Sequence, residues 1–154
     1  MKLSTRVRYG LRAMVELAKQ SDYKPMSLRE LAERQQVSSK YLEQMASALK
    51  IAGLVESVRG AEGGYRLARS ADQITAWDVY RVLDIASVPT DCLNYHCQRE
   101  KFCSSRELWD DLNRAIIDIL KSYSLRKLAK RELALQKKLG TDIPTGCAPK
   151  TDDR

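Results

Sequence analysis

The chain has 154 residues, of which 44% are hydrophobic and 31% charged, which suits one domain with an extension and excludes wholesale disorder. It contains no run of about 18 apolar residues and no apolar N-terminal signal, so we expect a cytoplasmic protein without a membrane partner. The net charge of +7 is carried mostly by residues 1–70, where 13 Lys and Arg residues outnumber 7 Asp and Glu residues.

Three helices are predicted in the first third of the chain from apolar residues at helical spacing. Ser4 can cap the first, which spans about five turns. Ser27 and Glu30 form a capping box for the second, and Ser38 can cap a third that stops near Gly53. The apolar faces of these helices contain Val7, Leu11, Met14, Val15, Ala18, Leu28, Leu31, Ala32, Leu42, Met45, Ala46 and Leu49.

A hairpin and more helices are predicted in the rest of the chain. Residues 54–58 and 65–68 are strand-like and flank a glycine-rich turn. Residues 77–86 suit a short helix, and a cysteine-bearing loop follows. The next helix starts near residue 108 and continues as a basic helix over residues 124–139. Its apolar stripe has little else in the chain to cover it, which predicts a dimer interface. The stripe contains Leu108, Leu112, Ile116, Ile119 and Tyr123.

These elements predict a mainly α fold with a small β-hairpin wing. Residues 1–70 would form a winged helix-turn-helix, because two short capped helices joined by a tight turn precede a glycine-rich basic hairpin. Residues 71–103 would form a connecting helix and the cysteine loop. Residues 104–139 would form the dimerisation and C-terminal helices, and residues 140–154 a flexible tail.

The helix after Ser38 is the predicted DNA-reading element, because the second helix of such a pair enters the major groove with its N-terminal residues toward the bases. Arg59, at the start of the wing, could insert into a narrow minor groove. The alternative is that these residues form only the solvated face of an amphipathic helix. The candidate DNA-binding residues are Ser38, Ser39, Lys40, Tyr41, Glu43, Gln44, Arg59 and Gly60.

Cys92, Cys97 and Cys103 place three thiols in one short polar loop. Thiolates at such a density favour an iron–sulfur cluster, since each iron needs thiolate or an occasional imidazole ligand. The alternatives are a zinc site that uses His96, and three buried structural thiols. Cys147 lies in the predicted tail and is interpreted as a plain free thiol.

Three segments carry a specific family resemblance: MKLSTRVRYGLRAM at residues 1–14, SKYLEQ at 39–44 and GLVESVRGAEGGY at 53–65. They resemble the Rrf-two family of winged-helix transcription regulators, typified by IscR and NsrR. The resemblance implies a homodimer with a long dimerisation helix and, in many members, iron–sulfur sensing. It also assigns DNA contacts to the residues at positions 39–41, 43, 44 and 59.

Two departures from the family pattern leave the fourth cluster ligand open. Arg106 stands where some members supply a histidine, and arginine cannot ligate iron. Arg8 stands where others recruit an acidic residue from the partner's first helix. An outside thiol is one remaining candidate, and a 2Fe-2S cluster is preferred to a 4Fe-4S cluster. The candidates within the chain are Asp91, His96, Glu107 and Cys147.

The sequence thus predicts a cluster-dependent repressor of cluster-biogenesis or of iron and redox stress genes. Its expected partners are a double-stranded DNA operator, a second copy of the chain and the cluster-assembly machinery. The alternatives are a nitric-oxide-sensing repressor of the same family and a cluster-free DNA-binding protein with a thiol switch. We do not expect an enzyme, because the sequence shows no paired carboxylates, phosphate-binding loop or Cys/His dyad.

Overall fold

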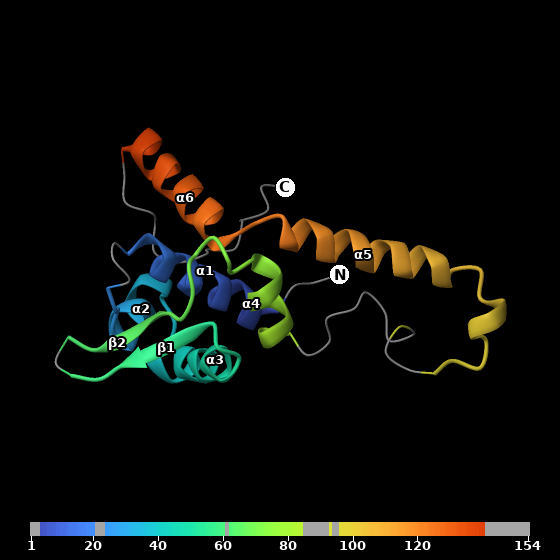
Figure 1. Cartoon of the computed structure of the whole chain (residues 1–154), viewed down its shortest axis with the longest axis horizontal. Helices are drawn as coiled ribbons and strands as arrows, with labels where there is room; N and C mark the ends of the chain where they lie inside the picture. The colour runs from blue at the N-terminus through green and yellow to red at the C-terminus, as the bar shows by residue number, and fades with distance from the viewer. Residues whose placement is uncertain (1–3, 21–23, 61, 85–92, 94–95, 141–154) are drawn as a thin grey trace, which may run out of the picture.

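The computed structural model describes residues 4–20, 24–60, 62–84, 93 and 96–140 (Figure 1). The predicted mainly α architecture with a β-hairpin wing is confirmed. In chain order the elements are α1 (Thr5–Lys19), α2 (Leu28–Gln35), α3 (Ser39–Ile51), β1 (Val55–Val58), β2 (Gly64–Leu67), α4 (Ala76–Leu83), the 3-10 helix η3 (Glu100–Phe102), α5 (Arg106–Lys121) and α6 (Leu125–Leu139). Among the described residues, no helix has both the length and the apolar character needed to cross a bilayer.

The three predicted serine caps are all present. The Ser4, Ser27 and Ser38 hydroxyls each accept a hydrogen bond from the backbone N–H three residues later. Each bond satisfies one of the donors that the first turn of a helix leaves without a partner. Glu30 donates its N–H to Ser27, while its carboxylate accepts from Arg34. These caps fix where the helices of the helix-turn-helix begin.

The wing is an antiparallel hairpin in which Val55 pairs with Leu67 and Val58 with Gly64. The backbone of Tyr65 also exchanges hydrogen bonds of 2.9 and 2.8 Å with Met26, which joins the segment before α2 to the hairpin. A side chain at Gly64 would meet the Met26 backbone, so this close approach requires glycine. The wing is therefore attached to the segment that leads into α2.

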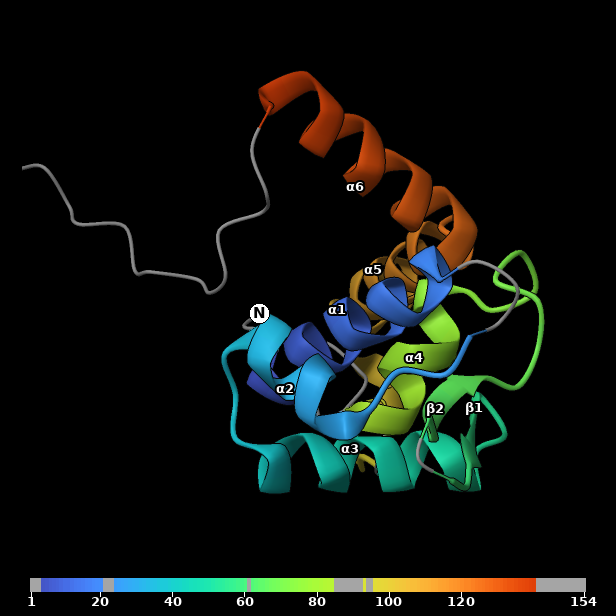
Figure 2. The ribbon, with the colours of Figure 1, turned by 90° about the vertical axis from the view of Figure 1, so that its left-hand side faces the viewer.

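One apolar core holds α1 to α4, the hairpin and the start of α6 together. Met14, Met45, Ile74, Val79 and Leu125 are all essentially inaccessible to solvent and belong to the same cluster. The core therefore continues past residue 70 into α4 and α6. We call this unit, consisting of α1–α4, the hairpin and α6, the winged head. In Figure 2, α1 runs through its middle, with α6 on one side and α3 on the other.

The prediction of a continuous helix through residues 108–139 is wrong. Helix α5 ends at Lys121, and Ser124 caps a new helix by accepting a hydrogen bond from the Lys127 N–H. The Tyr123 carbonyl accepts from Ala76, and the Leu125 N–H donates to the Ile74 carbonyl, both at 2.8 Å. These long-range bonds turn the chain between the two helices, which local helical periodicity could not reveal.

Helix α5 projects from the winged head, with η3 beyond its far end (Figure 1). No residue of α5 is buried. Helix α4 ends at Leu83, and residues 85 and 86, which the sequence predicted to be helical, lie outside the described residues. The fold thus consists of a packed head and one uncovered arm.

Candidate nucleic-acid interface and cysteine loop

The exposed face at the start of α3 contains most of the predicted DNA-contacting side chains. Ser39, Lys40, Glu43 and Gln44 are all exposed within the first two turns of the helix. A lysine supplies charge for phosphate or guanine, while glutamine can pair with adenine and glutamate with cytosine. This short segment therefore carries the donors and acceptors that base reading requires.

Two of the predicted contacts already have partners within the protein. The Ser38 hydroxyl caps α3 through the Tyr41 N–H at 3.2 Å. The half-buried Tyr41 ring packs edge-on against Tyr9, with ring centroids 6.3 Å apart, and its hydroxyl lies 3.3 Å from the Thr5 hydroxyl. Ser38 thus starts the helix, and Tyr41 fixes the position of α3 against α1.

The wing places Arg59 and Gly60 in exposed positions at the start of its turn. The hairpin is tied to α3 by a 2.7 Å hydrogen bond from Lys50 to the Ser57 hydroxyl. It is braced across its strands by the Arg66–Glu56 ion pair. Arg59 therefore extends from a hairpin whose orientation to α3 is fixed.

Two arginines of α1, Arg8 and Arg12, also lie near α3 but were not among the predicted DNA-binding residues. The guanidinium carbons of Arg8 and Arg12 lie 5.3 and 5.9 Å from the centre of the Tyr9 ring, and that ring contacts Tyr41 on α3. Cation–π contact at these distances holds long side chains in place. Their i, i+4 spacing around a tyrosine was the available sequence signal.

In the cysteine loop, the structure describes two of the three predicted ligands. Cys97 and Cys103 are half-buried free thiols, and Cys103 lies immediately before the first turn of α5. Its sulfur is 3.4 Å from the Ser105 hydroxyl, and this hydrogen bond lowers the pKa of the Cys103 thiol. Cys92, Cys147 and Asp91 lie outside the described residues.

The candidate fourth ligands in the described part of the loop, His96 and Glu107, are both exposed. Arg106 is 3.1 Å from the Glu100 carboxylate, and His96 lies 3.7 Å from the other oxygen of Glu100. Glu107 is exposed. Within the described ranges, no three His, Cys, Asp or Glu side chains come together as a metal site. Arg106 therefore acts as an anchor for η3.

The predicted dimer stripe is open to solvent along α5. Leu108, Leu112 and Ile119 are exposed, and Ile116 is half-buried. Tyr123 lies beyond the end of the helix, where the Lys127 ammonium sits 4.2 Å from the centre of its ring. The part of the stripe that lies on α5 therefore consists of Leu108, Leu112, Ile116 and Ile119.

Comparison with known proteins identifies the family. Residues 3–131 match Rrf2, described as an iron-dependent transcriptional regulator. The chain belongs to the Rrf2 family of transcriptional regulators. It is 43% identical to the regulator CymR of Bacillus subtilis over 84% of this chain and 90% of that protein, and 39% identical to IscR of Vibrio campbellii over 88% and 82%.

Solved structures of Rrf2 relatives have the same fold. The structure of B. subtilis CymR, titled the global cysteine regulator, has a TM-score of 0.74 at 41% identity and covers 85% of this chain and 98% of that one. The IscR of T. potens has a TM-score of 0.73 at 38% identity and covers 88% and 91%. These likenesses confirm the predicted resemblance and the winged-helix architecture.

Proposed function

We propose that this Rrf2 protein is a homodimeric DNA-binding repressor whose operator affinity depends on an iron–sulfur cluster in the cysteine loop. The observation that carries the proposal is the backbone contact of each thiol residue: the Cys103 carbonyl accepts a hydrogen bond from Arg106 at the start of α5, and the Cys97 carbonyl accepts one from Glu100 at the start of η3. A change at Cys103 would therefore act on the start of α5, a helix with no buried residue. The similarity of the chain to IscR proteins supports the cluster, and its membership of the Rrf2 family supports the DNA binding.

The DNA-binding half of the proposal rests on the exposed start of α3 and on the wing. Ser39, Lys40, Glu43 and Gln44 would read the major groove, and Arg59 would enter the minor groove. Arg8 and Arg12 would add phosphate contacts beside α3. Two heads on a two-fold dimer must meet half-sites about 34–36 Å apart or a multiple of that distance, so a small rotation of α5 changes affinity.

The chemistry of the loop fits a cluster. Cys97 and Cys103 are free and partly accessible. The Ser105 hydrogen bond lowers the pKa of Cys103, which favours the thiolate form that binds iron. Cys92 would be the third ligand. A bound cluster would supply a redox- and iron-responsive link between these thiols. The protein's own part is to hold η3 in place through Arg106 and Glu100.

The test is anaerobic purification followed by visible absorption and Mössbauer spectroscopy, with operator affinity measured on the same samples. We expect Cys92→Ala, Cys97→Ala and Cys103→Ala each to lose the chromophore and the cluster-dependent change in affinity. Cys147→Ala is the matched control and should retain both. Arg106→His should change the spectrum by placing nitrogen on one iron. Unchanged iron content and DNA affinity in all three loop variants would refute the cluster mechanism.

A second candidate function is a cluster-free thiol switch in the same loop. The lowered pKa of Cys103 and the similarity to CymR, a cysteine regulator, favour it. Oxidation of two loop thiols to a disulfide would then reposition the start of α5. Protein purified anaerobically would be colourless in this case, and its DNA affinity would respond to a thiol oxidant and recover with a reductant.

A further inference from the structure

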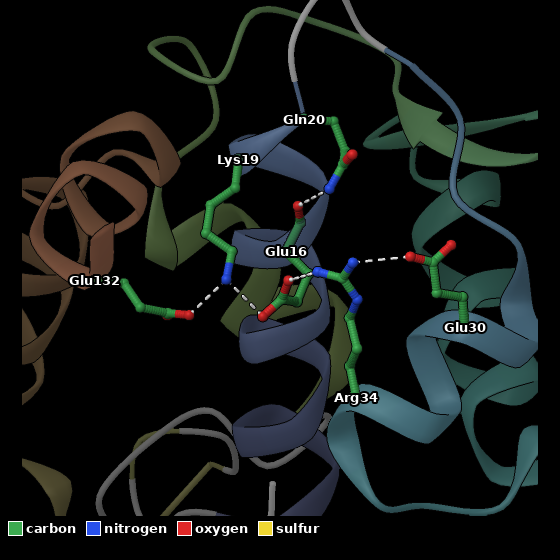
Figure 3. A network of polar contacts seen from close by, with 6 residues as sticks. All are labelled: Glu16, Lys19, Gln20, Glu30, Arg34 and Glu132. Carbon is green, nitrogen blue, oxygen red and sulfur yellow. Dashed lines mark hydrogen bonds and ion pairs between the residues drawn. The ribbon is translucent and has the colours of Figure 1, made fainter. Parts of the chain in front are cut away.

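A partly buried chain of charges joins three elements of the winged head (Figure 3). Glu16 of α1 accepts a hydrogen bond from Lys19 at 2.7 Å and another from Arg34 of α2 at 3.1 Å. Lys19 also donates to Glu132 of α6 at 2.8 Å. The side chains of Glu16 and Lys19 are only 11% and 9% exposed. Helix α6 is thereby connected to α2 through two buried side chains of α1.

Burial makes these contacts interdependent. A charge removed from water is costly unless its partners remain in place, and the loss of one partner leaves the other charge uncompensated. Lys19 divides its donors between Glu16 and Glu132, and Glu16 divides its two oxygens between Lys19 and Arg34. A displacement of Glu132 therefore changes how strongly Lys19 binds Glu16, and with it how strongly Glu16 binds Arg34.

The two ends of the chain lie at functionally placed sites. Arg34 is in the last turn of α2, two residues before Gln36, whose left-handed backbone (φ 51°) turns the chain toward Ser38 and α3. Glu132 is in α6, which follows α5 after the turn at Tyr123 and Ser124. One end thus meets the turn of the helix-turn-helix, and the other meets the helix that continues from the arm.

We propose that Glu16 and Lys19 are positioning residues that couple the placement of α6 to the placement of the recognition helix α3. Glu132, which is bonded to Lys19, and Arg34, which is bonded to Glu16, then affect DNA binding jointly through these two residues. This coupling rests on the DNA-binding function proposed above but not on the cluster. It supplies a route by which a movement of α5 reaches the bases, through α6, α1 and the end of α2.

The test is a double-mutant cycle with Glu132→Gln, Arg34→Gln and the double variant. Affinity is measured for a duplex that the wild-type protein selects from a random DNA pool, and the free energy of unfolding is measured in parallel. Both positions remain partly exposed, at 27% and 46%, and both substitutions keep a polar side chain, so folded variants are expected. The expected result is non-additivity in DNA affinity by a factor of about 3 to 10, typical of residues in one network.

The matched control pairs Glu132→Gln with Arg29→Gln on the same helix α2. Arg29 forms an ion pair with Glu33 at 2.9 Å, but these side chains are 87% and 65% exposed and lie outside the chain of charges. The effects of Glu132→Gln and Arg29→Gln on DNA affinity should multiply to within about twofold. Additive effects of Glu132→Gln and Arg34→Gln on affinity would overturn the coupling, even if the unfolding free energies are coupled. A wild-type protein that selects no duplex would instead refute the proposed DNA-binding function.

Discussion

The winged head and helix α5 differ in how their apolar side chains are covered. In the head, the large side chains of Met14, Met45 and Leu54 are inaccessible to solvent. On α5, Leu108 and Ile119 are exposed, and no residue of the helix is buried. Exposed apolar surface of this extent marks a partner surface. The apolar side chains of the head are therefore covered within the chain, whereas those of the arm are open to a partner of the kind proposed above.

Helix α6 shows that chain order does not decide which of the two regions an element joins. It directly follows α5, yet Leu125 and Ala129 are buried in the core of the head. Its Glu132 is bonded to Lys19 of α1. A substitution in α6 should therefore act on the stability of the head, and one on α5 should act on assembly.

The largest effect is expected from Leu125→Ala in the head. Leu125 has no solvent exposure, and loss of a buried leucine side chain typically lowers the free energy of unfolding by about 2–5 kcal/mol. Leu133→Ala, at a position of the same helix that is 49% exposed, should change it by about 0.5 kcal/mol or less. Urea unfolding of both variants provides the comparison. Equal losses would show that α6 does not belong to the core.

The next largest effect is expected from Ile116→Asp on the arm. A charge in the apolar stripe should weaken the dimer by about 2 kcal/mol or more, as at an interface hot spot, because it would be desolvated without a partner. Arg114→Ala, which removes an exposed ion pair with Asp111, should leave the dimer intact. Sedimentation velocity distinguishes the two variants. A stable dimer of Ile116→Asp would contradict the assigned interface.

A smaller effect is expected from Arg59→Ala in the wing. If Arg59 reaches a base edge, its loss should weaken DNA binding by about 1–3 kcal/mol. Binding by wild type should fall steeply with salt, because each phosphate that the interface neutralises contributes about 0.9 to the slope. Arg131→Ala, on α6 and away from α3 in Figure 2, is the control. Wild-type binding that does not change with salt would refute these contacts.

The smallest effect concerns the capping box of α4. Burial opposes ionisation of Asp78, but hydrogen bonds from Thr75 to its carboxylate outweigh this and hold the pKa of Asp78 below its usual 3.8. A lowered pKa gives stability that is present above pH 4 and is lost as the pH falls through the folded-state value. Asp78→Asn should therefore cost about 0.3–1 kcal/mol at pH 7.

Thermal unfolding at several pH values tests this assignment. The difference between wild type and Asp78→Asn should shrink as the pH falls below about 4. Asp111→Asn, in an exposed pair on α5, should show no comparable difference at pH 7. A difference that persists unchanged to pH 2 would mean that Asp78 does not act through its charge.

Local signals in the sequence predicted much of the head. Ser4, Ser27 and Ser38 cap their helices as expected, because a cap depends only on residues within one turn. The break between α5 and α6 was missed, because it depends on a backbone bond from Leu125 to the Ile74 carbonyl and another from Ala76 to the Tyr123 carbonyl, between segments far apart in the sequence. Periodicity carries no information about such partners.

The candidate site was predicted in a similarly uneven way. The exposed polar residues at the start of α3 followed from helix position alone, whereas the packing of Tyr41 against Tyr9 required the arrangement of α1 and α3. The sequence also showed that Arg106 cannot be a ligand. It could not show that Arg106 pairs with Glu100, because side-chain ion pairs in loops have no fixed spacing.

The central claim is that chemistry at the cysteine loop of the arm controls DNA binding by the head. The most direct measurement is the operator affinity of anaerobically purified wild type, compared with Cys103→Ala, at one salt concentration and with both proteins shown to be dimers. We expect wild type to be coloured, the variant to be colourless and folded, and their affinities to differ. Equal affinities for a coloured wild type and a colourless variant would contradict it.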